Sequence, residues 1–150
     1  VQALNGDGNN YGFLEIIDEY GLSDAANLSK FYAGASYLKL GNYENAINYL
    51  DEFSSSDLLI QARAYSLIGD AYVEIGDYDN AIYYFKKASN ENPNEFFTPS
   101  YLLKLAIVYE ETGDLESALD TYEEIIEEFK NSPEFQTSLK NKSRIEGLLL

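Results

Sequence analysis

The chain has 150 residues, of which 45% are hydrophobic and 15% aromatic, and this is enough to bury the core of one folded domain. Its 26 Asp and Glu against 10 Lys and Arg give a formal charge of −16, which repels phosphate backbones and anionic membrane surfaces. The absence of Cys and His removes thiol nucleophiles, disulfides, imidazole bases and the commonest zinc ligands. We therefore expect no catalytic residue, no cofactor, no metal site and no nucleic-acid partner.

No apolar run reaches the roughly 18 residues that a membrane span needs, so we expect no direct membrane insertion by this segment. The chain starts at Val1 rather than Met and carries no basic, apolar leader. This suggests a piece of a longer protein, whose targeting segment would lie upstream.

Apolar residues recur at helical spacing along the whole chain, and no strand is expected. The predicted helices are 9–20, 24–40, 43–54, 57–75, 78–91, 97–112, 115–130 and 134–148. The segment GDGNNYG at 6–12 has the spacing of a glycine-rich phosphate loop, but no apolar strand precedes it and no lysine or other basic residue follows closely. Read as a calcium loop, it has Tyr11 at a ligand position. We interpret it as a loop that leads into the first helix.

The first predicted helix belongs to half of a repeat. FLEIIDEYGLSD from Phe13 aligns with YEEIIEEFKNSP from Tyr122, and the first helix of such a pair would lie upstream of Val1. An apolar stripe would then lack part of its cover, namely Phe13, Ile16, Ile17 and Tyr20. Such a stripe favours pairing with a second copy of the chain, as a homodimer through the half repeat.

Three later segments align with one another without gaps: GNYENAINYLDEF, GDYDNAIYYFKKA and GDLESALDTYEEI. They begin at Gly41, Gly76 and Gly113, which are 35 and 37 positions apart. Each glycine marks a turn, and the residue after it can cap the next helix: Asn42, Asp77 and Asp114. Small residues that let two helices approach, and large ones that fill the groove beside them, recur in register: Gly34, Gly69 and Ala106 before the turn, then Ala46, Ala81 and Ala118, then Leu50, Phe85 and Tyr122.

This pattern resembles the tetratricopeptide repeat, whose period is roughly 34 residues. The middle copy matches best, through Gly69, Tyr72, Gly76, Tyr78, Ala81, Phe85, Ala88 and Pro93. The third copy departs from the pattern with Ala106 for the helix glycine and Leu115 for the tyrosine. The resemblance implies an all-α, right-handed superhelical solenoid of antiparallel helix pairs, with about three and a half repeats and a C-terminal capping helix.

We expect one domain over 1–150, divided into a half repeat at 1–23, three repeats at 24–56, 57–93 and 94–131, and the capping helix at 132–150. The long last unit, ending EEIIEEFKNSPEF, is similar to envelope-associated bacterial members of the family. That similarity implies a periplasmic or envelope-associated location, with the cytoplasm as the alternative.

The resemblance also implies a concave groove lined by the first helix of each pair. Its inward positions lie ten, six and three residues before each turn glycine: Phe31, Ala35, Leu38, Ser66, Asp70, Val73, Leu103, Ile107 and Glu110. Glu74 and Glu111 add negative charge, and only Lys39 and Arg63 are expected as cations nearby. We therefore predict a scaffold, not an enzyme, that binds a peptide or protein with basic and apolar residues and serves a larger bacterial assembly.

Family members that grip a C-terminal carboxylate have Lys and Asn where this chain has Phe31, Ala35, Ser66 and Asp70. The chain therefore does not match that binding mode. Two alternative functions stay open: a self-assembling structural module without a groove ligand, and an accessory protein that holds a small cation such as a polyamine. The binding surface could also lie outside the groove.

Overall fold

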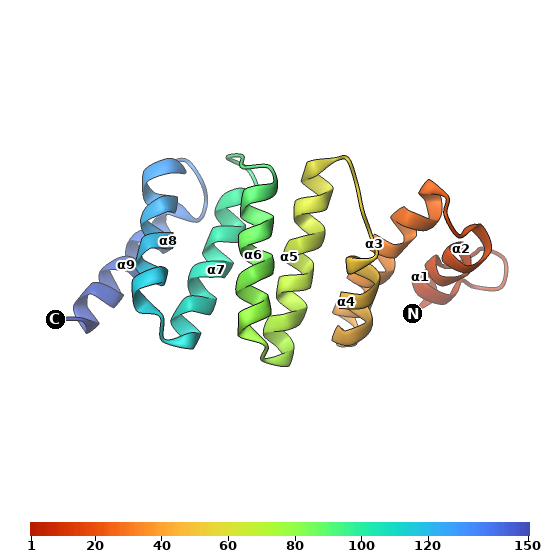
Figure 1. The fold of residues 1–150 in the computed structure, drawn as a ribbon, viewed down its shortest axis with the longest axis horizontal. Coiled ribbons are helices and arrows are strands. Elements are labelled where there is room, and N and C mark those ends of the chain that lie inside the picture. Colours follow the sequence, from red (N-terminus) through yellow and green to blue (C-terminus); the bar gives the residue numbers. More distant parts are fainter.

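The computed structural model describes residues 1–150 as a row of nine helices without a strand (Figure 1). The helices are α1 (Gln2–Asn5), α2 (Phe13–Tyr20), α3 (Asp24–Lys39), α4 (Tyr43–Asp51), α5 (Leu58–Ile75), α6 (Tyr78–Glu91), α7 (Thr98–Thr112), α8 (Leu115–Glu128) and α9 (Phe135–Leu148). Each helix packs mainly against its neighbours in the chain, so the fold is the expected helical solenoid.

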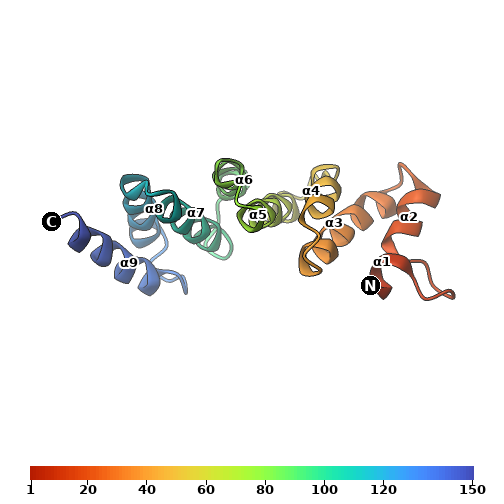
Figure 2. The ribbon, with the colours of Figure 1, turned by 90° about the horizontal axis from the view of Figure 1, so that it is seen from below.

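The solenoid has two layers of helices. Figure 2 shows α4, α6 and α8 in one row, and α3, α5, α7 and α9 in the other. Antiparallel pairs therefore follow one another along the chain as α3 with α4, α5 with α6, and α7 with α8. We call the surface that α3, α5 and α7 (residues 24–39, 58–75 and 98–112) turn away from the other layer the inner face.

The turns within the pairs have the predicted chemistry. Gly41, Gly76 and Gly113 adopt φ angles of 76°, 79° and 79°, in the left-handed region that only glycine enters at little cost. The residue after each glycine caps the next helix by accepting a hydrogen bond from a backbone N–H three positions on: Asn42 from Asn45, Asp77 from Asn80 and Asp114 from Ser117. Residues within the turn therefore determine where the first helix of each pair ends and where the second begins.

Small residues let the helices of each pair approach closely. A methyl group added at Gly69 would lie 2.7 Å from the Phe85 ring, and one at Gly34 would lie 2.5 Å from Leu50 Cγ. Phe85 and Leu50 are each 1% exposed and belong to the core. In these two pairs the small residue of the first helix therefore lies directly against a large core residue of the second helix.

The N-terminal region differs from its prediction in two ways. The second helix begins at Phe13 rather than near residue 9, because Asp7 holds the preceding loop by accepting hydrogen bonds from the backbone N–H groups of Asn9 and Asn10. The short helix α1 was not predicted, and its Leu4 is only 3% exposed. Part of the cover expected from an upstream helix thus comes from α1, which packs against α2 and α3.

Candidate functional site

The inner face contains two neighbouring hollows, and five of the nine predicted groove residues line them. Leu38, Asp70, Val73 and Ile107 line the first hollow, and Phe31 lines the second, with 6% of its surface exposed. Ala35 and Leu103 are half-buried and line neither hollow. Ser66 and Glu110 are held by other side chains of the protein.

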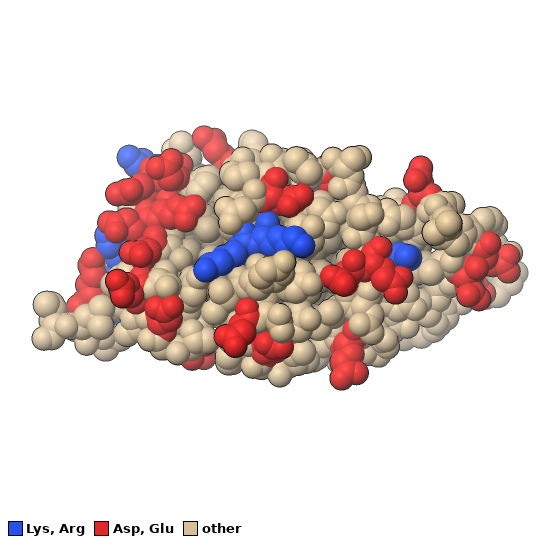
Figure 3. Space-filling model, viewed as in Figure 1, with Lys and Arg blue, Asp and Glu red and all other residues tan.

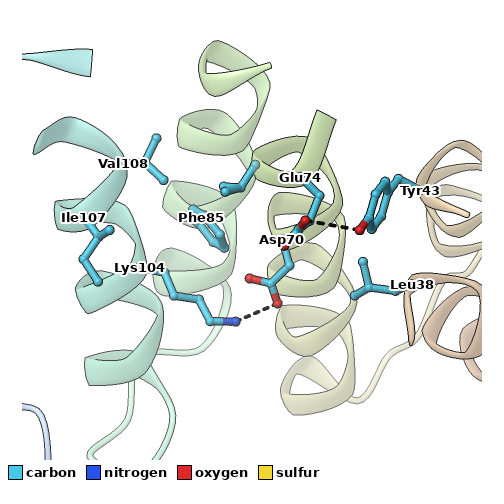
Figure 4. A pocket seen from close by; sticks show the side chains of 9 residues that line it. Leu38, Tyr43, Asp70, Glu74, Phe85, Lys104, Ile107 and Val108 are labelled. Atoms are coloured by element: carbon cyan, nitrogen blue, oxygen red, sulfur yellow. Dashed lines mark hydrogen bonds and ion pairs between the residues drawn. The ribbon is translucent and has the colours of Figure 1, made fainter. Parts of the chain in front are cut away.

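The first hollow, which we call the Asp70 pocket, has a volume of about 390 Å³. Its walls come from five helices, α3 to α7, and consist of Leu38, Tyr43, Asp70, Val73, Glu74, Phe85, Lys104, Ile107 and Val108. Figure 4 shows Lys104 extending from α7 toward Asp70 on α5, with Phe85 behind the two. Ile107 at the rim is 44% exposed, so an apolar surface is open to solvent there.

An ion pair crosses the floor of this pocket between two repeats. Lys104 Nζ lies 2.7 Å from Asp70 Oδ2, donates a second hydrogen bond of 3.2 Å to Ser66 Oγ, and stands 5.7 Å from the centre of the Phe85 ring. Burial raises the pKa of the Asp70 carboxyl, and the Lys104 ammonium opposes that rise. The third N–H of Lys104 and the Oδ1 atom of Asp70 are left for other partners.

Glu74 carries the second negative charge of the Asp70 pocket. Its Oε2 accepts a hydrogen bond of 3.2 Å from the Tyr43 hydroxyl, and this bond raises the pKa of Tyr43 (Figure 4). No cation pairs with Glu74, which is exposed. The carboxylate is therefore free to meet a positive charge on another molecule.

The second hollow, which we call the Arg63 pocket, lies at the opposite end of α5 and has a volume of about 420 Å³. It is lined by Phe31, Tyr32, Asp57, Leu59, Ile60, Arg63, Phe97 and Tyr101. Apolar side chains stand open at its rim, because Tyr32, Leu59 and Phe97 are 45%, 44% and 42% exposed. Arg63 is exposed and makes no ion pair.

Glu110 was predicted as an acidic point of the groove, but the structure gives it another contact. Its Oε1 accepts a hydrogen bond of 2.6 Å from the Tyr122 hydroxyl, and its Oε2 pairs with Arg144 of α9. Only 17% of the Glu110 side chain is exposed. Its charge therefore holds the capping helix instead of facing a partner.

The predicted charge of the groove also needs correction. Lys39 and Arg63 are not the only cations near it, since Lys104 and Arg144 neutralise Asp70 and Glu110. Lys104 was missed because its position is not basic in the other two repeats, which have Tyr32 and Leu67 there. Its spacing of three residues from Ile107, on one helix face, was the signal that could have found it.

The opposite face, formed by α4, α6 and α8, has a different character. Figure 3 shows basic side chains gathered over α6 in the middle of this face and acidic ones at the α8 end. Helix α6 contributes Lys86 and Lys87, whereas α8 contains six acidic residues and no basic one. The hollow between α6, α7 and α8 is lined mostly by polar residues, unlike the two inner pockets.

The structure shows neither a cluster of metal ligands nor a helix that could span a membrane. No group of three or more Asp and Glu side chains is placed to hold a metal ion. No helix combines the length and the apolar character that crossing a bilayer requires.

Comparison with known families gives two matches to models described as the tetratricopeptide repeat. One covers residues 33–95 and the other covers residues 72–142, so the two overlap and extend from α3 into α9. No curated protein sequence matches the chain.

Several solved structures have a similar fold. The crystal structure of MamA superposes with a TM-score of 0.73 at 23% identity, over 91% of this chain and 74% of that one. PcrH in complex with the chaperone binding region of PopB gives 0.65 at 16% identity, over 83% and 98%. The type III secretion translocator chaperone SycD of Yersinia enterocolitica gives 0.59 at 20% identity, over 89% and 95%. At these identities the likeness concerns the fold.

Proposed function

The chain belongs to the tetratricopeptide-repeat family, and from this membership we propose that its inner face binds a segment of another polypeptide. The chain would act as a protein-interaction scaffold and perform no chemical step. The observation that carries this proposal is the pair of neighbouring hollows on α3, α5 and α7, both rimmed by exposed apolar side chains.

The shape and lining of the pockets fit side chains of a peptide. With volumes of about 390 and 420 Å³, each can take one or two apolar side chains. Covering exposed apolar rim residues such as Ile107 and Leu59 would release water and supply the affinity.

Polar groups on the floor fit the backbone of the same ligand. The free N–H of Lys104 can donate to a peptide carbonyl, and Asp70 Oδ1 can accept from a peptide N–H. Because Lys104 and Asp70 are already paired, they need little reorganisation to do so. Apolar pockets would then provide affinity, and this pair would fix the position of the ligand backbone.

The similar structures support the proposal and suggest its setting. PcrH was crystallised with the chaperone binding region of PopB, and SycD is a translocator chaperone of type III secretion. PcrH is thus seen with a segment of another protein, and SycD serves a secretion system of a bacterium, Yersinia enterocolitica. We propose a comparable setting here, a bacterial assembly of several proteins.

Selection from a displayed library of short random peptides on the intact chain tests the proposal. We expect enriched peptides rich in apolar residues, and we expect their binding to be lost in Ile107→Asn. Tyr83→Asn is the matched control, because Tyr83 is also exposed but lies on α6 and lines neither pocket. Circular dichroism should show that both variants keep their helices.

Three results would contradict the proposal. The library could yield no enriched peptide on the intact chain. The enriched peptides could bind Ile107→Asn as well as the unchanged protein. They could also lose binding to Tyr83→Asn while they keep it to Ile107→Asn, which would move the site to the opposite face.

A second candidate function is self-association through the N-terminal half repeat. Phe13 already stacks on Tyr32 with ring centres 5.4 Å apart, but Tyr11, Tyr20 and Leu22 stay largely exposed at this end of the solenoid. Sedimentation velocity over a range of concentrations tests this candidate. A mass that rises with concentration, and returns to that of the monomer in Tyr20→Ser, would favour it over the groove.

A further inference from the structure

We infer that the polypeptide segment bound on the inner face is bipolar, with an acidic residue beside Arg63, a basic residue beside Glu74 and apolar residues between them. This inference rests on the proposed function and adds to it the chemistry of the partner. It follows from which charges of the inner face are already used within the protein and which are free.

Most charges near the two pockets are neutralised internally. Asp70 is paired with Lys104 at 2.7 Å, and Glu110 is paired with Arg144. A ligand charge gains little from a carboxylate that already has its counter-ion beside it. The charges that remain for a ligand are therefore those of Arg63 and Glu74.

Arg63 is a free cation although Asp57 lines the same pocket. Asp57 is the N-cap of α5, where its Oδ1 accepts a hydrogen bond of 3.0 Å from the backbone N–H of Leu59. The positive end of the helix thus partly balances this carboxylate. No carboxylate lies within ion-pair distance of the Arg63 guanidinium, which is exposed.

Glu74 is the free anion at the other end of the same helix. It is exposed, it lines the Asp70 pocket, and its only hydrogen-bond partner is the neutral Tyr43 hydroxyl. A neutral donor leaves the full negative charge available to a ligand. One helix, α5, therefore presents a free cation to one pocket and a free anion to the other.

Helix geometry sets the spacing between these charges. Arg63 and Glu74 are 11 positions apart on α5, which is about three helical turns, so both lie on the same side of the helix. The rise between them is about 16 Å. An extended peptide covers that distance in about five residues. We expect the acidic and basic residues of the ligand at roughly this separation.

A uniformly basic ligand fits this surface less well. The formal charge of −16 attracts any cationic peptide from a distance. At contact, however, a second basic residue would lie beside the free guanidinium of Arg63 and be repelled. Repulsion between like charges at an interface excludes the wrong ligands and so contributes mainly to specificity. An all-acidic ligand meets the same difficulty at Glu74.

The displayed random-peptide selection can test the inference when it is run in parallel on the intact chain, Arg63→Glu and Glu74→Lys. Both residues are exposed and outside the core, so the variants should fold. Peptides enriched on the unchanged protein should carry one acidic and one basic residue. Arg63→Glu should enrich dibasic peptides, and Glu74→Lys should enrich diacidic ones.

Synthetic versions of one enriched peptide, with each charge neutralised in turn, should bind about two- to fivefold more weakly at low salt, because exposed ion pairs have about this strength. The difference should shrink as salt is added. Enrichment of dibasic peptides by the unchanged protein would overturn the inference. It would also be overturned if Arg63→Glu and Glu74→Lys enriched peptides with the same charges as the unchanged protein does. If binding still depends on Ile107 in that case, the proposed function stands and only the bipolar ligand is wrong.

Discussion

Lys104 of α7 reaches the Asp70 carboxylate of α5 at 2.7 Å, although 34 residues separate the two in sequence. The pair joins adjacent repeats across the inner face, with Lys104 also bound to Ser66. Both groups are partly shielded, since the side chains of Lys104 and Asp70 are 39% and 31% exposed. An ion pair in this setting contributes more than one fully in water.

Replacing Lys104 by Met should destabilise the protein by about 1 kcal/mol at neutral pH, the upper end for a partly exposed pair. The variant leaves Asp70 half-buried without its counter-ion, so the pKa of Asp70 should rise further above its usual value. A carboxylate whose pKa is raised in the folded state destabilises the fold while it is ionised, and protonation removes that destabilisation. The difference in unfolding free energy between the two proteins should therefore narrow as the pH falls through the pKa of Asp70.

Urea denaturation at several pH values measures this difference. Arg63→Met is the control, because Arg63 lies on the same face without an ion pair. If the unfolding free energies of Lys104→Met and the unchanged protein differ by the same amount at every pH, Lys104 stabilises the protein through packing and not through the Asp70 charge.

Gly69 should not tolerate a side chain of any size. The methyl group of Gly69→Ala would meet Phe85 Cε1 at 2.7 Å and Cδ1 at 2.8 Å, and the ring is too buried to move aside freely. We expect a loss of about 1–3 kcal/mol in unfolding free energy from overpacking. Gly147→Ala in α9 is the matched control, since nothing lies within 4 Å of the added methyl group. In Gly147→Ala only the helix propensity changes, so the unfolding free energy should stay equal or rise by up to about 1 kcal/mol.

Thermal unfolding of the two glycine variants separates the two effects. Equal melting temperatures for Gly69→Ala and the unchanged protein would mean that α5 and α6 can separate without cost. That result would contradict the close approach of these helices as the reason for the repeat glycine.

The features that could be predicted from the sequence are those set by neighbouring residues. A left-handed glycine followed by a capping side chain, as in Gly76 and Asp77, is a local event, so its three copies reveal the helix boundaries. Small and large residues such as Gly69 and Phe85 recur with the same period, whereas the contact between these two residues is shown by the structure. These patterns carry the resemblance to the tetratricopeptide repeat, and that resemblance implies the solenoid.

The charge pattern of the site could not be predicted, because it depends on contacts between repeats. Whether Lys104 meets Asp70, or Arg144 meets Glu110, is decided by the twist from one helix pair to the next and by long, flexible side chains. Neither contact recurs in the other copies. Helix α1 was missed for another reason, since its four residues are too few to show a helical period.

Tyr122→Phe should loosen the capping helix. The hydroxyl of this fully buried tyrosine donates to Glu110 Oε1 at 2.6 Å and accepts from Asn141 Nδ2 at 3.0 Å. Burial, followed by the bond to Glu110, raises the pKa of Tyr122, so the hydroxyl keeps its proton. Removing it leaves Glu110 and Asn141 short of a partner, at a cost of about 1–3 kcal/mol.

Hydrogen exchange should locate that loss in α9, with faster exchange there than in α5 or α6. Tyr20→Phe is the control, because the Tyr20 side chain is 52% exposed. If α9 exchanges at the same rate in Tyr122→Phe as in the unchanged protein, the hydroxyl network does not hold the capping helix.

Asp114→Asn should keep the start of α8 intact but remove part of the pH dependence of stability. The folded state holds the pKa of Asp114 below its usual value, chiefly because the hydroxyl and the backbone N–H of Ser117 donate hydrogen bonds to the carboxylate. A lowered pKa gives stability that is present above the usual value, about 3.9, and lost as the pH falls through the folded one. Asparagine caps α4 in the same way through Asn42, and it does not titrate.

Urea denaturation should therefore show nearly equal stability for Asp114→Asn and the unchanged protein at neutral pH. Below about pH 4 the unchanged protein should lose stability faster, because only its cap becomes protonated. Asp114→Ala provides the contrast, because it lacks the capping side chain at any pH. It should be less stable than Asp114→Asn at every pH. Parallel stability curves for Asp114→Asn and the unchanged protein in acid would mean that the carboxylate charge adds nothing to the cap, and that hydrogen-bond geometry alone starts α8.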